Sequence, residues 1–195
     1  MGQARHFAFP VVFCVLGFLA LAASVYVTFA PQGTRGAASL IGGPFKLVAQ
    51  DGRTVTDADF IGAPLLVFFG YTNCPDVCPT TLQQISDILH KMGSDKKIAV
   101  LFVTVDPERD TPAVLKDYLS SFDPRIIGLS GDRPAIDAAM RAYRVYAKKV
   151  PAGGDAYSMD HTAIVYLMDK QGRFVSAFNA EQPVDAAAKD LSSYL

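Results

Sequence analysis

The chain has 195 residues, a formal net charge of −1 at pH 7, three cysteines and no tryptophan. Half of its residues are hydrophobic, which is enough to build one ordinary domain with a buried core. Because no basic patch accompanies the near-zero charge, the composition argues against a protein that binds nucleic acid.

An apolar run near the N-terminus predicts a membrane anchor. The 24 residues 7–30 carry no charge, and as a helix they would extend about 36 Å, more than the roughly 30 Å hydrocarbon core of a bilayer. Arg5 precedes the run, so the positive-inside tendency leaves residues 1–6 in the cytoplasm and sends the rest across. These few residues leave no room for a transit peptide. We therefore expect a single-pass protein of a bacterial inner membrane, with its C-terminal domain in the periplasm.

Two other interpretations of the apolar run remain open. Ala20-Leu21-Ala22 is a plausible cleavage site for a signal peptide, although the run continues past it further than is usual for one. Lipidation of Cys14 is disfavoured because Val11-Val12-Phe13 offers no small residue directly before it, so we interpret Cys14 as an apolar membrane residue.

Residues 31–43 are rich in Gly, Ala and Pro and predict a linker, after which residues 44–195 form one domain. Within this domain, apolar strands alternate with amphipathic helices, a pattern that predicts an α/β sandwich around a central mixed sheet. Residues 150–160 are expected to form an irregular loop. In chain order, we expect strands over 45–48, 54–55, 65–69, 98–105, 126–129, 162–168 and 173–178, and helices over 79–92, from 111, over 134–143 and from about 183.

Two cysteines stand four residues apart, after the strand 65–69 and at the start of a helix. Cys74 and Cys78 can point at one spot if the segment between them coils through about one turn. A helix N-terminus favours thiolates, which bind soft metals and attack disulfides. A disulfide closing so short a loop would add little stability. The pair therefore indicates metal binding, thiol redox chemistry, or both.

A histidine supplies the third candidate ligand. His90 falls late in the helix 79–92, where a surface imidazole is mildly favoured. His161 directly precedes the strand 162–168, and the predicted fold brings the cysteine loop close to it. A hydrogen-bonded structural histidine is the usual role of such a residue, but His161 is the best placed of the three histidines to be a ligand.

The donor set favours copper. Two thiolates and one imidazole suit copper(I), and the same set with an additional weak ligand suits copper(II). Zinc would require a fourth ligand, which Asp76 or Asp160 could supply.

Three motifs resemble the Sco/SenC family in spacing and order. They are Cys74-Pro75-Asp76-Val77-Cys78-Pro79, the loop Asp106-Pro107-Glu108-Arg109-Asp110-Thr111-Pro112, and Asp160-His161-Thr162. The resemblance covers about residues 40–195 and the anchor. It implies a membrane-anchored, thioredoxin-like copper protein that helps to assemble the CuA centre of cytochrome c oxidase. It also implies that Cys74, Cys78 and His161 hold the copper ion, as Cu(I) and Cu(II), with Asp160 beside the site.

Two functions remain open. The first is a metallochaperone whose partners are the cytochrome c oxidase subunit that carries the CuA site and other periplasmic copper chaperones. The second is a membrane-anchored thiol:disulfide reductase, with Cys74 and Cys78 as its redox pair, which acts on the cysteines of the CuA site. Copper binding requires His161, whereas dithiol exchange does not. A copper-responsive sensing domain is a third alternative that no feature of the sequence supports directly.

Overall fold

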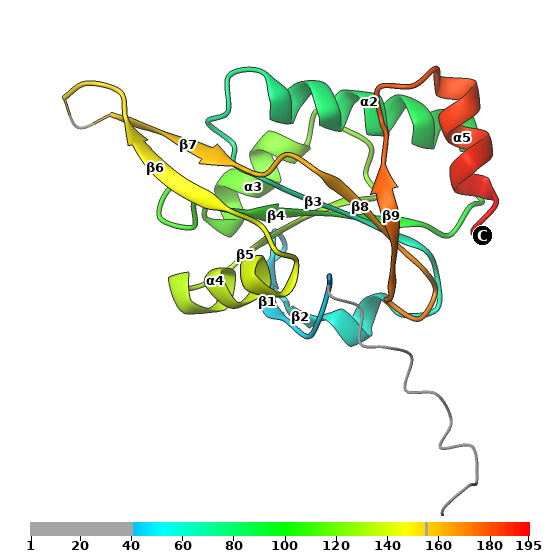
Figure 1. Ribbon diagram of the computed structural model, residues 1–195, viewed down its shortest axis with the longest axis horizontal. Coiled ribbons are helices and arrows are strands. Elements are labelled where there is room, and N and C mark those ends of the chain that lie inside the picture. Colours follow the sequence, from blue (N-terminus) through cyan, green and yellow to red (C-terminus); the bar gives the residue numbers. More distant parts are fainter. Residues whose placement is uncertain (1–40, 155) are drawn as a thin grey trace, which may run out of the picture. The chain divides into compact units, whose positions relative to one another are not determined.

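The computed structural model describes residues 41–154 and 156–195 (Figure 1). The predicted anchor, residues 7–30, and most of the predicted linker lie outside the described residues. In the described part of the chain, no helix combines the length and the apolar composition that crossing a bilayer requires.

A seven-stranded mixed sheet forms the centre of the domain, in the order β2-β1-β5-β4-β3-β8-β9. Its three middle strands are parallel, and the strands added at both edges are antiparallel to their neighbours. This arrangement confirms the predicted α/β sandwich with a mixed sheet. In chain order the elements are β1 (Lys46–Ala49), β2 (Thr54–Thr56), η1 (Asp57–Phe60), β3 (Leu65–Gly70), α2 (Val77–Met92), β4 (Ala99–Thr104), α3 (Pro112–Leu119), β5 (Ile126–Ser130), α4 (Arg133–Ala142), β6 (Ala147–Pro151), β7 (Tyr157–His161), β8 (Val165–Met168), β9 (Phe174–Phe178) and α5 (Val184–Ser192).

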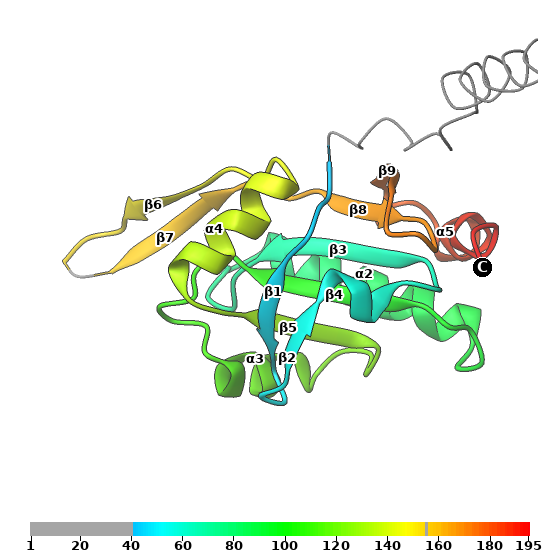
Figure 2. The same ribbon diagram turned by 90° about the horizontal axis from the view of Figure 1, so that it is seen from below.

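Helices cover both faces of this sheet. Right-handed crossovers between the parallel strands place α2 and α3 on the same face. Figure 1 shows α2 and α4 on opposite sides of the strands, and Figure 2 looks onto the sheet with α2 behind it. Since its faces are covered, β3 is buried at every position and consists of apolar residues and one glycine. The aromatic rings of Phe68 on β3 and Phe102 on β4 pack with their centroids 5.9 Å apart. Both rings belong to the buried core, and the ring of Phe102 also lies against Gly70, the last residue of β3.

The prediction of an irregular loop over residues 150–160 is wrong. The chain instead forms an antiparallel hairpin in which β6 pairs with β7, so that Ala147 lies opposite His161. Figure 1 shows this hairpin reaching away from the central sheet. Within its two strands Met159 alone is buried, so the sequence lacks the alternation of apolar and polar residues that marks a half-buried strand.

The strand predicted over residues 162–168 is correspondingly shorter. β8 begins at Val165, because the hairpin ends at His161 and residues 162–164 lead the chain back to the sheet. His161 is therefore the last residue of a strand in the hairpin and does not immediately precede a strand of the central sheet.

Candidate metal site

The cysteine loop leaves the carboxyl end of β3 and enters the first turn of α2. Cys78 is fully buried in that turn, whereas Cys74 is only partly buried. The Cys78 N–H points at the other sulfur, at 3.4 Å from Cys74 Sγ. One of the unpaired amides at the start of a helix thus reaches a sulfur atom, and both sulfurs are free thiols.

Gly70, the last residue of β3, leaves room for the buried sulfur. A Cβ atom at this position would lie 2.8 Å from Cys78 Sγ and 2.6 Å from Cε2 of Phe102. Both separations are too short for real contacts between these atoms, so a side chain at position 70 would displace Cys78 or the Phe102 ring.

Burial dominates the electrostatics of Cys78. Desolvation raises the pKa of its thiol far above the ordinary value, and the neighbouring Cys74 and Asp110 add to the rise. The preference for thiolate that we expected from the helix N-terminus does not overcome this effect at Cys78. A metal ion that binds Cys78 must therefore displace the thiol proton.

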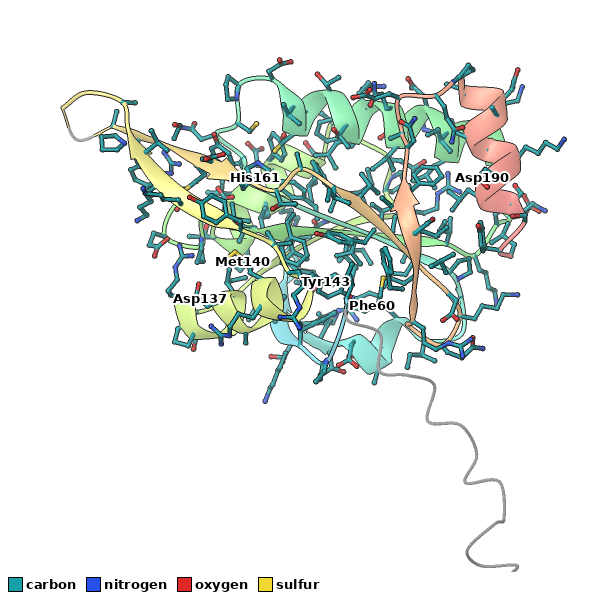
Figure 3. All side chains as sticks on the ribbon, viewed as in Figure 1. Phe60, Asp137, Met140, Tyr143, His161 and Asp190 are labelled. Atoms are coloured by element: carbon teal, nitrogen blue, oxygen red, sulfur yellow. The ribbon has the colours of Figure 1, made fainter. Side chains whose placement is uncertain are left out.

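His161 is the last residue of β7 (Figure 3), and its ring faces the buried cysteine. Its Nε2 atom lies 3.7 Å from Cys78 Sγ, and its Nδ1 atom lies 3.0 Å from the carbonyl oxygen of Thr162. Because a carbonyl oxygen only accepts hydrogen bonds, Nδ1 carries the hydrogen in the neutral ring and Nε2 presents its lone pair toward the sulfur. The ring of Tyr71 meets the imidazole edge-on, with centroids 5.7 Å apart.

The structure brings the three predicted ligands together. The ligand atoms of Cys74, Cys78 and His161 all lie within 4.8 Å of one another. Thiolate and imidazole bind an ion such as zinc at about 2.0–2.3 Å, so small shifts would seat one ion among them. Within the described residues, neither Asp76 nor Asp160 joins this cluster as a fourth ligand for zinc. The donor set fits copper better than a closed, four-coordinate zinc site.

Two further expectations concern residues around the cluster. The His161 ring is oriented by the hydrogen bond that its Nδ1–H donates to the Thr162 carbonyl oxygen, whereas Asp160 is exposed and makes no such bond with the ring in the described residues. His90 has the surface role predicted for it: its side chain is 70% exposed in the last turn of α2, with Nε2 3.6 Å from a carboxylate oxygen of Asp123.

The loop after β4 holds the cysteine loop in place through Asp110. This side chain is fully buried, and its Oδ2 atom accepts hydrogen bonds from the Thr72 N–H at 3.0 Å and the Thr104 hydroxyl at 2.6 Å. Its Oδ1 atom accepts from the Thr72 hydroxyl at 2.6 Å. The sequence indicated this loop only as a family signature at the same edge of the sheet as the cysteines, and did not predict the contact.

We expect Asp110→Ala to lower the free energy of unfolding by about 2–4 kcal/mol, because it leaves buried donors unpaired. Asp110→Asn is the matched variant. Its amide oxygen can accept from the Thr72 N–H and the Thr104 hydroxyl, while its NH₂ group donates to the Thr72 hydroxyl. Urea denaturation of both variants at neutral pH measures the difference, and equal losses of stability would contradict this account.

The stabilities of the parent and of Asp110→Asn should also depend differently on pH. Burial raises the pKa of Asp110, an effect that hydrogen bonds from Thr104 and Thr72 only partly offset. The folded state therefore holds this proton more tightly than the unfolded state, and the associated stability is lost as the pH rises through the raised pKa. Since Asp110→Asn cannot ionise, its stability relative to the parent should increase over that interval. A constant difference across the acid range would contradict the assigned direction.

The family model described as SCO1/SenC matches residues 33–195. The chain belongs to the SCO1/SenC family. Protein SenC of Rhodobacter capsulatus is 40% identical to this SCO1/SenC chain over 167 residues, covering 84% of the chain and 75% of SenC. The human mitochondrial SCO1 homolog is 38% identical over 160 residues, covering 80% of the chain and 53% of the human protein. The chain thus spans about half the length of the mitochondrial relatives it matches.

A solved structure of the family is similar over the described domain. The structure of Bradyrhizobium japonicum ScoI with copper bound is 58% identical, has a TM-score of 0.78 and covers 80% of this SCO1/SenC chain and 99% of the ScoI chain. The family model and this match confirm the predicted family and the thioredoxin-like α/β fold that it implied.

Proposed function

We propose that this chain is a copper metallochaperone that delivers copper to, or helps to mature, the CuA site of cytochrome c oxidase. The observation that carries the proposal is the convergence of Cys74, Cys78 and His161 to within 4.8 Å of one another. Membership of the SCO1/SenC family and the 58% identity to a ScoI solved with copper support it.

The three residues would supply two kinds of ligand atom to the copper ion. Cys74 and Cys78 belong to one loop, and as thiolates they offer copper(I) two soft ligands. His161 comes from the hairpin and adds the harder nitrogen donor that copper(II) prefers. Because the thiol of Cys78 is protonated at neutral pH, the chain would release this proton when copper binds and recover it when copper leaves.

We also propose where the chain is located and which partners it has. Residues 1–6 would be cytoplasmic, residues 7–30 would cross a bacterial inner membrane, and residues 31–43 would link this anchor to a periplasmic domain formed by residues 44–195. The partners would be the oxidase subunit that carries the CuA site and other periplasmic copper chaperones that supply the ion.

A second candidate function is reduction of disulfides in the CuA site before copper is loaded. The unequal exposure of the two sulfurs favours it: Cys74 is accessible to a partner and Cys78 is buried behind it. The Cys74 thiolate would attack the partner's disulfide and release one partner thiolate. Cys78 would then attack Cys74 and pass its thiol proton to the departing partner sulfur, so that the partner leaves as a dithiol, reduced by two electrons, and the chain keeps a Cys74–Cys78 disulfide.

We expect the reduced chain, purified whole in detergent, to bind one copper ion, and its Cys74–Cys78 disulfide form to bind no copper(I). A disulfide has no thiolate to offer, so binding must depend on the redox state of the pair. Metal analysis of both forms after anaerobic reconstitution measures this. Stoichiometric zinc in place of copper, or equal copper(I) in the two forms, would refute the proposed site.

A further inference from the structure

Arg109 lies between the cysteine loop and the hairpin that carries His161. Its guanidinium carbon is 3.7 Å from the ring centroid of Tyr157, the first residue of β7, and its Nη1 atom donates to the Tyr157 carbonyl oxygen at 2.9 Å. The same carbon is 5.8 Å from the ring of Tyr71, which meets the His161 imidazole edge-on. Arg109 thus contacts both the strand that ends in His161 and the ring that packs against it.

Asp106 fixes this arginine from the core. Its side chain is fully buried; one carboxylate oxygen accepts from Arg109 Nε, and the other accepts from the Tyr157 hydroxyl at 2.9 Å. A buried carboxylate is costly unless it is paired and hydrogen-bonded. Asp106, Arg109 and Tyr157 therefore form a closed set of contacts in which each member restricts the other two.

The hairpin has few other buried attachments. It lies outside the seven-stranded sheet, and Met159 is the one buried residue of β6 and β7. Lys149 on β6 lies 3.9 Å from Glu108 and 4.6 Å from the Tyr157 ring centroid. An exposed ion pair of this kind contributes little. It also reaches the loop that carries Arg109, so this loop is one main attachment of the hairpin, beside the hydrogen bond between Tyr71 and the backbone of Met159.

We propose that Arg109 is a positioning residue for the copper site: it acts through Tyr157 to hold the hairpin, and with it His161, over Cys74 and Cys78. This inference rests on the proposed copper function and extends it to a residue that is not a ligand. The same loop fixes the cysteine side through Asp110 and Thr72, so it sets the separation between the thiols and the imidazole.

A selective effect on the two oxidation states of copper follows. Copper(II) binding depends on the nitrogen of His161 and therefore on Arg109. Copper(I) would be held mainly by two thiolates of the cysteine loop, which Asp110 anchors through Thr72 and Arg109 touches only at the ring of Tyr71. Loss of Arg109 should therefore weaken copper(II) binding and leave copper(I) binding nearly unchanged.

Two variants distinguish a positioning role of Arg109 from a general effect on the stability of the fold. Arg109→Lys keeps the positive charge near Asp106, but one ammonium cannot stack on Tyr157 while donating in two directions as the planar guanidinium does. Tyr157→Ala removes the stacked ring and the hydroxyl that donates to Asp106, but it leaves the Arg109–Asp106 ion pair in place, so the buried carboxylate keeps its charged partner. Tyr146→Ala is the matched control, because this tyrosine directly precedes the hairpin and is 55% exposed.

The first measurement is copper affinity of the full chain in detergent, with electron paramagnetic resonance of the copper(II) form. We expect Arg109→Lys and Tyr157→Ala to weaken copper(II) binding by about tenfold or more, within the range for residues that support a metal ligand, and to reduce the nitrogen coupling from His161. Copper(I) affinity should change by less than about twofold, the agreement found for independent sites. Unchanged copper(II) binding, or equal losses for both ions together with lower stability, would overturn the proposal.

The second measurement needs no metal. Amide hydrogen exchange of residues 157–161 in the metal-free chain should accelerate by about tenfold in both variants relative to the parent and Tyr146→Ala, because the hairpin loses its stacking and hydrogen bonds. Unchanged exchange would overturn the proposal. If the parent itself fails to bind copper, the proposed function fails, while the exchange rates still decide whether Arg109 holds the hairpin.

Discussion

Cys78→Ser should lower the copper(I) affinity of the reduced chain by more than about 100-fold, since it removes a ligand rather than a residue that supports one. The hydroxyl oxygen is a hard, neutral donor and does not replace a thiolate. It also fits where the sulfur lies, because serine is the smaller residue and Gly70 already leaves space there. The loss should therefore come from ligand chemistry and not from a collapsed loop. Competition titration against a copper(I) chelator measures it.

Cys14→Ser is the matched control, because the same substitution then falls on the one remaining cysteine, in the apolar run outside the described residues. Its copper(I) affinity should equal that of the parent. Cys74→Ser should resemble Cys78→Ser. A Cys78→Ser protein that still holds copper(I) as tightly as the parent would remove the buried thiol from the site.

His161→Ala should separate the two oxidation states of copper. Copper(II) affinity should fall by more than about 100-fold, because the sole nitrogen donor of the cluster is lost. Copper(I) tolerates two thiolates and should be retained in part. The disulfide of Cys74 and Cys78 should still form and exchange, since the imidazole takes no part in that bond. Binding titrations and exchange with a dithiol buffer report these properties on one protein.

This variant also distinguishes the two candidate functions in cells. Oxidase assembly should fail in His161→Ala if transfer of copper is the role of the chain, and should persist if reduction of thiols is its role. His90→Ala provides the control, because that imidazole is 70% exposed at the other end of α2 and should change neither property. If His161→Ala binds copper(II) as tightly as the parent, His161 is only a structural histidine.

The elements that bury apolar surface were predictable from the sequence. The strand β3 and the helix α2 were expected within two residues of their observed ends, because a continuous apolar run and a helical repeat of buried residues mark them. The hairpin of β6 and β7 was missed for the opposite reason. It is held by backbone hydrogen bonds and by Arg109, and its exposed strands carry no pattern of apolar residues.

The residues of the site were likewise predictable only in part. Cys74, Cys78 and His161 could be named in advance because few residue types bind soft metals and the chain has few of them. Asp110 and Arg109 could not, because aspartate and arginine are common in surface loops. Their roles depend on contacts with Thr72 and Tyr157, 38 and 48 positions away, which no local pattern encodes.

Gly70 limits where this metal-binding loop could be transplanted. An engineer who grafts residues 71–79 onto another α/β protein would copy both thiols, but branched and aromatic residues are enriched in strands and glycine is depleted. A Cβ atom at the position of Gly70 would lie 2.8 Å from the second sulfur, which would have to rotate outward into solvent. The graft must therefore include the last residue of the strand as well as the loop, and its host must keep a flat ring under that glycine, as Phe102 does here.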